Sequence, residues 1–387
     1  MPSDRRPRVL IAILVYNGRA FVPRALESAA RVATDDAEVD VLALDDCSPD
    51  PGWSEDLEAH CTRLGIGYYC SPRNVGIPRN MNLGLLRGLS AGYEHVIILN
   101  SDVILPFNLV SALLAVASRH DRVASVTAWS NNASIYSLPN TDPDGLLADP
   151  ATVDRLSSIL EETFGAEGIE IPTAVGFCML IPTATVRDVG LFDPVFGRGY
   201  CEELDWSLRA NAAGFSNLLA TNAFVYHEGS ATTREAGLLA QGETTVTAHE
   251  AIIDQRYPLF RGQVSTFGDS DRYDRLAQDA VRAVVLHAAR SEGYELDLTS
   301  LRSQYGPPTD VRFSVETTAL RGRYRGFEAR FDVATGEDRL DLVTKLVGAP
   351  PRRINLYGTD EMATRLATTA RERNLVVEQR ASYPERV

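Results

Sequence analysis

Apolar runs of strand length alternate with amphipathic segments along the first hundred residues of the chain. The apolar runs are residues 8–16, 39–46, 66–72 and 95–102. The segments between them, with apolar residues at helical spacing, are residues 18–33, 54–65 and 78–92. Unbroken apolar runs are typical of parallel strands that are covered on both faces. The alternation therefore predicts an α/β fold with a doubly wound, mostly parallel sheet and right-handed crossovers.

The pattern changes after Tyr257-Pro258. The later segments predict helices at residues 270–293, 337–348 and 359–374, and strands at 311–320, 326–334, 353–358 and 375–381. We therefore expect two domains, a larger one at residues 1–265 and a smaller α/β accessory domain at 266–387. The stretch at residues 139–150 is rich in Pro, Asp and Gly. A loop of that length in a compact domain is usually a lid, a binding loop or a mobile segment.

Composition narrows the class of protein. The 387 residues are 44% hydrophobic and 23% charged, as in globular proteins, and a net charge of -14 disfavours nucleic acid held on a basic surface. The five cysteines lack CxxC spacing, which fits a reducing compartment without disulfides or structural zinc. The first apolar run favours a buried strand over a signal peptide, and no run approaches the roughly 20 apolar residues of a membrane span. We expect a cytoplasmic protein and leave open peripheral contact with the inner face of a membrane.

Acidic side chains follow two of the predicted strands. Asp46 precedes Cys-Ser-Pro-Asp, so an Asx-turn or a helix cap is the simplest role, and an acceptor for a ribose hydroxyl or a base N–H is the alternative. Asp102 stands between two apolar runs, directly after Asn100 and Ser101. Hard divalent cations take such oxygen ligands together with substrate phosphates. Capping of the next helix is the competing role for Asp102.

A second acidic cluster opens the predicted helix within GYCEELDWSLRANAAGF. Glu202, Glu203 and Asp205 place three acids in four positions. Acids in a first turn complement the helix dipole, but three exceed what capping requires, so we expect some of them to face a cleft. His227 then follows another apolar run, and a single histidine is more often an ordinary surface or core residue than a metal ligand.

Taken in order, these motifs resemble the nucleotide-sugar-dependent glycosyltransferases of family 2, which have the GT-A fold, and most closely their rhamnosyltransferase-type members. The matching segments are VLIAILVYNG, VLALDDCSPD, SPRNVGIPRNMNLGL, ILNSDVILP, the stretch from Val175 to Phe215, and VYHEGS. Six motifs in the family's order make the resemblance specific. It covers about the first 230–260 residues and says nothing of residues 270–387.

The resemblance implies a role for each matching position. The backbone at Val15 and Tyr16 and the carboxylate of Asp46 would hold the uridine or thymidine of the donor. The other positions implied to bind the nucleotide sugar are Asn74, Arg79, Asn82, Ser101 and Asp205. Asp102 would bind Mg²⁺ or Mn²⁺, with His227 as a further ligand. Glu203 would be the general base, and Glu202 is the second candidate because Glu203 is one methylene longer than the family's aspartate.

The implied reaction is an inverting transfer from a UDP- or dTDP-sugar to a hydroxyl of a glycan, a lipid-linked or a small-molecule acceptor. Asn100 replaces the first Asp of the family's D-x-D motif, which suggests a less strict metal dependence. Two alternatives remain, a catalytically weakened binding or scaffold protein and a nucleotidyltransferase. The first is disfavoured because Asp102, Glu203 and His227 are all retained, and the second because no Gly-rich basic loop follows the first strand. The accessory domain would dock the acceptor, bind a partner or form a homo-oligomer.

Overall fold

The computed structural model describes residues 5–133, 136–139, 145–229, 245–298, 310–316, 318–334, 337–357 and 361–380. The chain forms two compact units, and each is described separately. Unit 1 comprises Met1–Ser137 and Ala148–Tyr273, and unit 2 comprises Leu138–Leu147 and Asp274–Val387. The two units divide after Tyr273, a little beyond residue 265, where the change of sequence pattern predicted the domain boundary. Assignment of the segment Leu138–Leu147 to unit 2 was not anticipated from the sequence.

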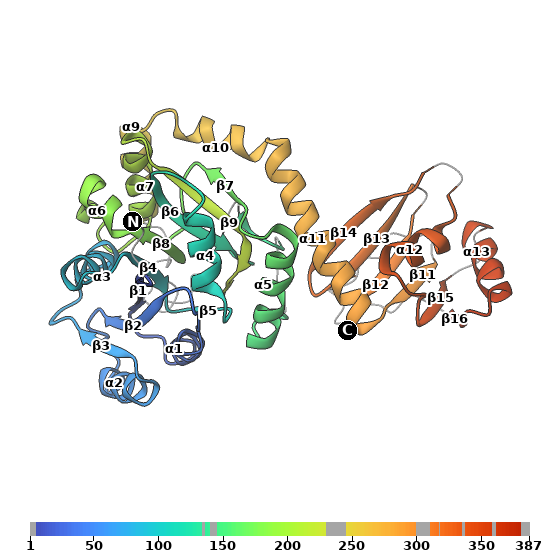
Figure 1. Ribbon diagram of the computed structural model, residues 1–387, viewed down its shortest axis with the longest axis horizontal. Helices are drawn as coiled ribbons and strands as arrows, with labels where there is room; N and C mark the ends of the chain where they lie inside the picture. Colours follow the sequence, from blue (N-terminus) through green and yellow to red (C-terminus); the bar gives the residue numbers. More distant parts are fainter. Residues whose placement is uncertain are drawn as a thin grey trace. The chain divides into compact units, whose positions relative to one another are not determined.

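An eight-stranded, mostly parallel sheet forms the centre of unit 1 (Figure 1). The strands lie in the order β3-β2-β1-β4-β8-β6-β9-β7, with β8 and β7 antiparallel to their neighbours. Their bounds are β1 Arg8–Val15, β2 Glu38–Asp45, β3 Gly67–Cys70, β4 His95–Asn100, β6 Val123–Trp129, β7 Gly168–Ile171, β8 Cys178–Pro182 and β9 Ser216–Phe224. Nearly every residue of β1, β4 and β6 is buried, as expected for strands covered on both faces.

Helices complete unit 1. Their bounds are α1 Val22–Ala30, α2 Trp53–Leu64, α3 Ile77–Ala91, α4 Leu109–Ala117, α5 Pro150–Phe164, α6 Thr183–Val189, α7 Glu202–Ala212, α9 Thr245–Arg256 and α10 Phe260–Gly268. Leu10, Ala12 and Leu14 of β1 share a hydrophobic core with residues of α3, α6 and α7. Successive side chains of a strand alternate between its faces, so Ile11 and Ile13 are buried against the other face. Helices α4 and α5 pack against β9.

The strand order reverses between β1 and β4, which are neighbours although β2 and β3 separate them in sequence. Ligands of open α/β sheets bind at such a switch point, beyond the carboxyl ends of the strands. Tyr16 and Ser101 follow these two strands. A two-stranded ribbon, β5 (Val103–Ile104) with β10 (Tyr226–His227), adjoins the same edge. The fold therefore gathers the predicted motifs at one edge of the sheet.

Unit 2 contains its own six-stranded sheet in the order β14-β13-β12-β11-β15-β16. The bounds are β11 Glu295–Leu298, β12 Arg312–Val315, β13 Ala319–Tyr324, β14 Phe327–Asp332, β15 Arg353–Tyr357 and β16 Val377–Arg380, with helices α11 Asp271–Glu292, α12 Arg339–Val347 and α13 Glu361–Glu372. Strands β12, β11, β15 and β16 are parallel, and β12, β13 and β14 form an antiparallel meander. The predicted class, a mostly parallel α/β sheet with a second, smaller α/β unit, is confirmed.

One predicted strand of unit 2 is wrong. Residues 311–320 were expected to form one strand, but the chain turns after β12, where the Glu316 N–H donates to Ala319 O, and returns as β13. Arg325 (φ 44°) and Gly326 (φ 88°) then make the two-residue turn into β14, because a tight hairpin needs positive φ at both positions. Alternating polar and apolar residues predicted strands here but did not reveal where they turn back.

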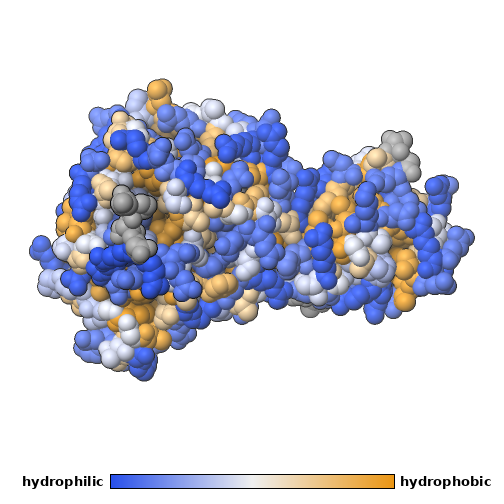
Figure 2. All heavy atoms as spheres, viewed as in Figure 1, coloured by the Kyte–Doolittle hydropathy of each residue, from blue (hydrophilic) through white to orange (hydrophobic). Residues whose placement is uncertain are grey.

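Polar residues cover most of the face of the molecule seen in Figure 2, with apolar residues between them. Among the described residues, no helix is long and apolar enough to cross a membrane.

Candidate active site

Asp102 and His227 lie side by side where β4 ends. The antiparallel pairing of β5 with β10 places His227 opposite Val103, and the Glu228 N–H donates to the Asp102 carbonyl at 2.9 Å. As a result His227 Nε2 lies 3.4 Å from Asp102 Oδ1. Both side chains are largely buried. Two residues that are 125 positions apart in the printed sequence are thus brought together by a short β-ribbon.

Two groups fix the His227 ring, and a third holds its backbone. Its Nδ1 lies 2.7 Å from the carbonyl oxygen of Asn132, and the ring stacks on Phe177 with 5.2 Å between the ring centroids. The Asn131 amide holds the His227 backbone, accepting from its N–H at 2.8 Å and donating to its carbonyl at 3.0 Å. Because Nδ1 faces a carbonyl, the neutral ring carries its proton there and turns the Nε2 lone pair toward Asp102.

Burial alone would lower the pKa of His227, but the hydrogen bond and the charge of Asp102, together with the Asn132 carbonyl, outweigh it and raise the pKa above its ordinary value. The pair therefore attracts positive charge. A carboxylate oxygen and an imidazole nitrogen suit Mg²⁺ or Mn²⁺, and metal-binding histidines commonly donate their other N–H to a carbonyl. The residues present fit a divalent cation that takes its remaining ligands from water and phosphate.

The protein alone does not enclose such an ion. Within the part of the chain that the structure describes, no cluster of three or more His, Cys, Asp or Glu side chains suited to a metal is found. Ser101 is buried beside Asp102, and Asn100 Nδ2 lies 3.5 Å from His227 Nε2. The uncharged Asn100 thus occupies the position from which a second carboxylate would face the same point.

Glu202 and Glu203 are the first two residues of α7. Glu202 is buried, Glu203 is half-buried, and the Oε2 atom of each has no hydrogen-bond partner among the described residues. Burial raises the pKa of Glu202 well above its ordinary value, and the charge of Glu203 adds to the rise. Burial also raises the pKa of Glu203, against the effect of two backbone N–H groups. Buried carboxylate oxygens without partners are unusual and mark candidate ligand contacts.

A short segment connects the two carboxylate sites. A Cβ atom on Gly176 would lie 3.7 Å from Cγ of Glu203, so the Glu203 side chain passes directly over this glycine. The next residue, Phe177, stacks on His227. Its carbonyl also accepts from the Asn100 N–H at 3.0 Å. Glu203 thus packs beside Gly176, one residue before the ring that stacks on His227. The general base and the metal site stay predictions.

Asp46 shapes a loop. Its carboxylate accepts from the N–H groups of Val75 at 2.7 Å and Gly76 at 2.9 Å, and its own N–H donates to the Val15 carbonyl at 2.8 Å. Burial raises the pKa of Asp46 despite these two hydrogen bonds. Gly76 has a φ of 83°, and a Cβ there would lie 2.1 Å from the carbonyl oxygen of Gly197. The contacts thus support a structural role, and the predicted contact with a nucleoside stays a prediction.

The neighbouring Asp45, for which the sequence predicted no role, accepts more hydrogen bonds than Asp46. It is completely buried and accepts from the Ser48 N–H and hydroxyl, the Ser54 hydroxyl at 2.6 Å and the Tyr68 hydroxyl at 3.0 Å. Four donors satisfy a buried carboxylate. The Asp45-Asp46 doublet therefore holds the carboxyl end of β2 in place.

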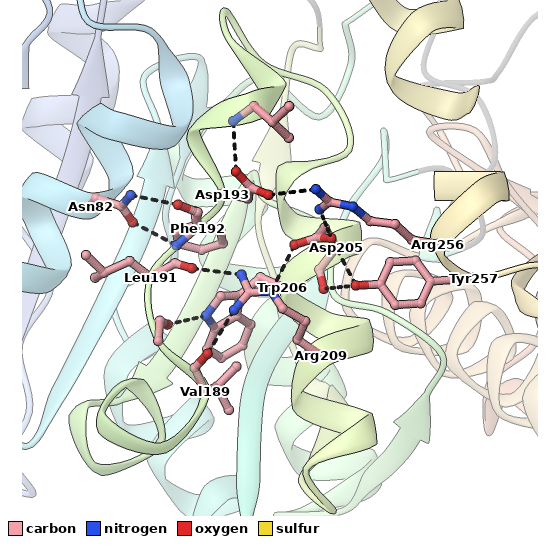
Figure 3. Close-up of polar contacts among 12 residues, drawn as sticks. Asn82, Val189, Leu191, Phe192, Asp193, Asp205, Trp206, Arg209, Arg256 and Tyr257 are labelled. Carbon is pink, nitrogen blue, oxygen red and sulfur yellow. Dashed lines mark hydrogen bonds and ion pairs between the residues drawn. The ribbon is translucent and has the colours of Figure 1, made fainter. Parts of the chain in front are cut away.

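The side chains of Asn82 and Asp205 also form hydrogen bonds with other groups of the protein (Figure 3). The Asn82 amide donates to Phe192 O and accepts from Phe192 N–H, each at 2.9 Å. Asp205 accepts from Arg209 at 2.9 Å, Arg256 at 2.7 Å and the Tyr257 hydroxyl at 2.9 Å. For these two residues the contacts give no support to the predicted donor binding.

The remaining predicted positions are more accessible. Arg79 and Asn74 are exposed, and Arg79 makes a long contact of 3.4 Å with the Val75 carbonyl. Tyr16 is half-buried. Tyr16 and Asn74 lie on the loops beyond the carboxyl ends of β1 and β3, and Arg79 lies in the first turn of α3. All three stay predicted donor contacts.

Sequence reasoning missed Asn131, Asn132 and Phe177. A signal for the first two was present, since they follow the buried strand β6 as directly as Asp102 follows β4. The same rule about strand ends would have included them. Phe177 carried no such signal, because an aromatic residue before an apolar run predicts only core packing.

Part of the chain matches a known protein family in sequence. The sequence profile of Glycosyl transferase family 2 matches residues 10–189. No curated protein matches the chain in sequence.

Solved structures also resemble the chain, at low sequence identity. They include GalNAc-T7 with UDP, GalNAc and Mn²⁺ (14% identity, 72% of this chain and 55% of that chain, TM-score 0.49). Others are S. aureus TarS 1-349 (15%, 72% and 82%, 0.41) and the mannosyltransferase PcManGT from Pyrobaculum calidifontis in complex with GDP-Man and Mn²⁺ (14%, 73% and 87%, 0.42). The chain thus spans about half the length of the GalNAc-T7 chain. In sequence, residues 10–189 of the chain thus match the profile of glycosyltransferase family 2.

Proposed function

We propose that unit 1 is an inverting glycosyltransferase that moves a sugar from a UDP- or dTDP-sugar to a hydroxyl acceptor. The observation that carries this proposal is the pairing of Asp102 with His227, whose ring stacks on Phe177, next in the chain to the Gly176 on which Glu203 packs. All of these residues lie around the carboxyl edge of the sheet, where the strand order reverses. The match of residues 10–189 to the family 2 profile supports the same class of reaction.

Glu203 is the favoured general base. A base must reach the acceptor hydroxyl, and Glu203 is the more exposed of the two residues, with its Cβ and Cγ packed beside Gly176. The Oε2 atoms of both glutamates are buried and lack a hydrogen-bond partner among the described residues. In the proposed step the acceptor oxygen forms a bond to the anomeric carbon, the bond to the diphosphate oxygen breaks, and Glu203 takes the hydroxyl proton. The nucleoside diphosphate leaves with the electron pair. Such a base contributes about 10²–10⁴-fold to the rate.

Asp102 and His227 would hold the divalent cation, Mg²⁺ or Mn²⁺. When bound, the ion would stabilise the negative charge of the departing diphosphate. The protein's part is to keep both ligands in place, through the Asn132 carbonyl on Nδ1 and the Phe177 ring. Asn100 leaves one carboxylate at this position, so we expect the affinity for the ion to be modest in the absence of donor.

Turnover by the full-length chain tests the proposal. A panel of UDP- and dTDP-sugars, including a rhamnosyl donor, would be assayed for hydrolysis and transfer with and without Mn²⁺. Glu203→Gln is expected to lower kcat by about 10²-fold or more while donor affinity stays near wild type. Glu202→Gln is the matched control, because it removes a neighbouring buried charge at the same helix start. A larger loss in Glu202→Gln would assign the base to Glu202.

Two other outcomes would contradict the proposal. Donor binding without any turnover would identify a binding or scaffold protein. Release of diphosphate from a nucleoside triphosphate, with no use of nucleotide sugars, would identify a nucleotidyltransferase.

A further inference from the structure

Helix α9 carries a buried histidine that contacts the segment in front of the two candidate catalytic acids. His249 is 8% exposed, and its Nδ1 lies 3.0 Å from the carbonyl oxygen of Gly199 and 3.1 Å from that of Tyr200. The ring meets Phe196 edge-on, with 5.5 Å between the ring centroids. A nitrogen that faces two carbonyl oxygens acts as a donor, so His249 carries its proton on Nδ1.

The segment that His249 contacts is conformationally strained. Gly199 has a φ of 121°, and Tyr200 and Cys201 follow with φ values of 72° and 73°. Two consecutive non-glycine residues in this region are unfavourable and persist only where the surroundings hold them. Glu202 and Glu203 come next in the chain, so the direction in which α7 begins depends on this strained turn.

Helix α9 is held in place by contacts with residues on both sides of the turn. Ile253 is buried with Phe196 and Cys201 in one apolar cluster. Arg256 forms ion pairs with Asp193 before the turn, at 2.9 Å, and with Asp205 after it, at 2.7 Å (Figure 3). The imidazole of His249 is therefore presented from a rigid support rather than from a mobile loop.

We infer that His249 is a positioning residue for the reaction: its Nδ1–H holds the Gly199 and Tyr200 carbonyls and so fixes the Glu202–Glu203 pair toward the acceptor. The inference rests on the proposed function. It lies outside residues 10–189, which the family profile matches, and it assigns a role to a helix that the motif analysis left without one.

The test compares three variants of the full-length chain. His249→Ala removes the donor, and His249→Asn restores an N–H at about the place of Nδ1. Ile253→Val is the matched control, since it removes one methyl group from the same cluster without touching either carbonyl. We expect His249→Ala to lower kcat by about 10–100-fold with the KM for donor within about twofold, because misplacement by about 1 Å can cost 10²-fold. His249→Asn should recover most of this loss, and Ile253→Val should show none of it.

Hydrogen exchange supplies a readout that does not depend on turnover. We expect the amides of residues 199–203 to exchange faster in His249→Ala than in wild type, and not in Ile253→Val. Unchanged exchange in His249→Ala, or equal loss of kcat in His249→Ala and Ile253→Val, would overturn the inference. A wild-type chain that uses no donor would instead refute the proposed function, and the exchange result would still show whether His249 holds the turn.

Discussion

The clearest quantitative test concerns Asp205, for which sequence and structure point to different roles. The motif resemblance implies a contact with the nucleotide sugar, whereas the structure surrounds its fully buried carboxylate with Arg209, Arg256 and Tyr257. If the structural role is the correct one, Asp205→Asn changes stability far more than donor binding. The substitution keeps the volume of the side chain and removes its charge.

The size of the effect follows from these partners. Removing one member of a buried charge pair costs about 3–5 kcal/mol, because the remaining charge stays buried without compensation. The side chains of Arg209 and Arg256 are 30% and 38% exposed, so water takes over part of their hydrogen bonding. We therefore expect Asp205→Asn to lower the free energy of unfolding by about 3 kcal/mol, the lower end of this range. At about 2–4 °C per kcal/mol for a domain of this size, Tm should fall by about 6–12 °C.

Thermal unfolding and donor affinity would be measured on the same preparations. Tyr257→Phe is the graded control. Burial and the Asp205 carboxylate raise the pKa of Tyr257 to about 12, so its hydroxyl stays protonated and donates. Its loss should cost about 1.5 kcal/mol. A Tm change under about 2 °C in Asp205→Asn, combined with a tenfold loss of donor affinity, would refute the structural assignment and return Asp205 to the donor site.

Three further predictions concern the two acidic sites. Glu202→Gln should raise Tm near pH 8 but not near pH 4. The folded-state pKa of Glu202 is raised above its ordinary 4.5, so the wild-type free energy of unfolding falls as pH rises from 4.5 through the folded pKa. Calorimetry that shows the same difference in Tm between variant and wild type at both pH values would contradict this. The pKa of Glu203 is also raised above its ordinary 4.5, and Glu203 must be deprotonated to act as the base. As the pH is lowered, kcat should therefore begin to fall at a pH above 4.5. A profile of kcat that is flat down to pH 4.5 would exclude Glu203 as the base. Mn²⁺ binding, measured by calorimetry with donor present, should be lost in Asp102→Ala and weakened less in His227→Ala. It should be weakened about tenfold in Asn131→Ala, which frees only the backbone of His227. Equal Mn²⁺ affinities in all three variants would place the ion elsewhere.

The sequence by itself determined the α/β class, most of the strands and helices, and the edge of the sheet where function is expected. These features depend on local periodicity, and on the rule that the carboxyl ends of parallel strands share one edge. The pairing of Asp102 with His227 did not follow from these rules; the motif resemblance implied it, and the structure places the two side chains 3.4 Å apart. The turn between β12 and β13 escaped this reasoning, because alternation continues through it.

Only the tertiary structure decided what each acid does. Asp45, Asp46, Asp205 and Glu203 all look alike in the sequence, as carboxylates at the end of a strand or the start of a helix. Their roles differ because of donors supplied from distant segments: Tyr68 reaches Asp45, Val75 and Gly76 reach Asp46, and Arg256 reaches Asp205. The Oε2 of Glu203 has no such donor among the described residues. A buried carboxylate whose hydrogen bonds are satisfied within the protein stabilises the fold, whereas one left unsatisfied is available to a substrate, and local sequence does not distinguish the two.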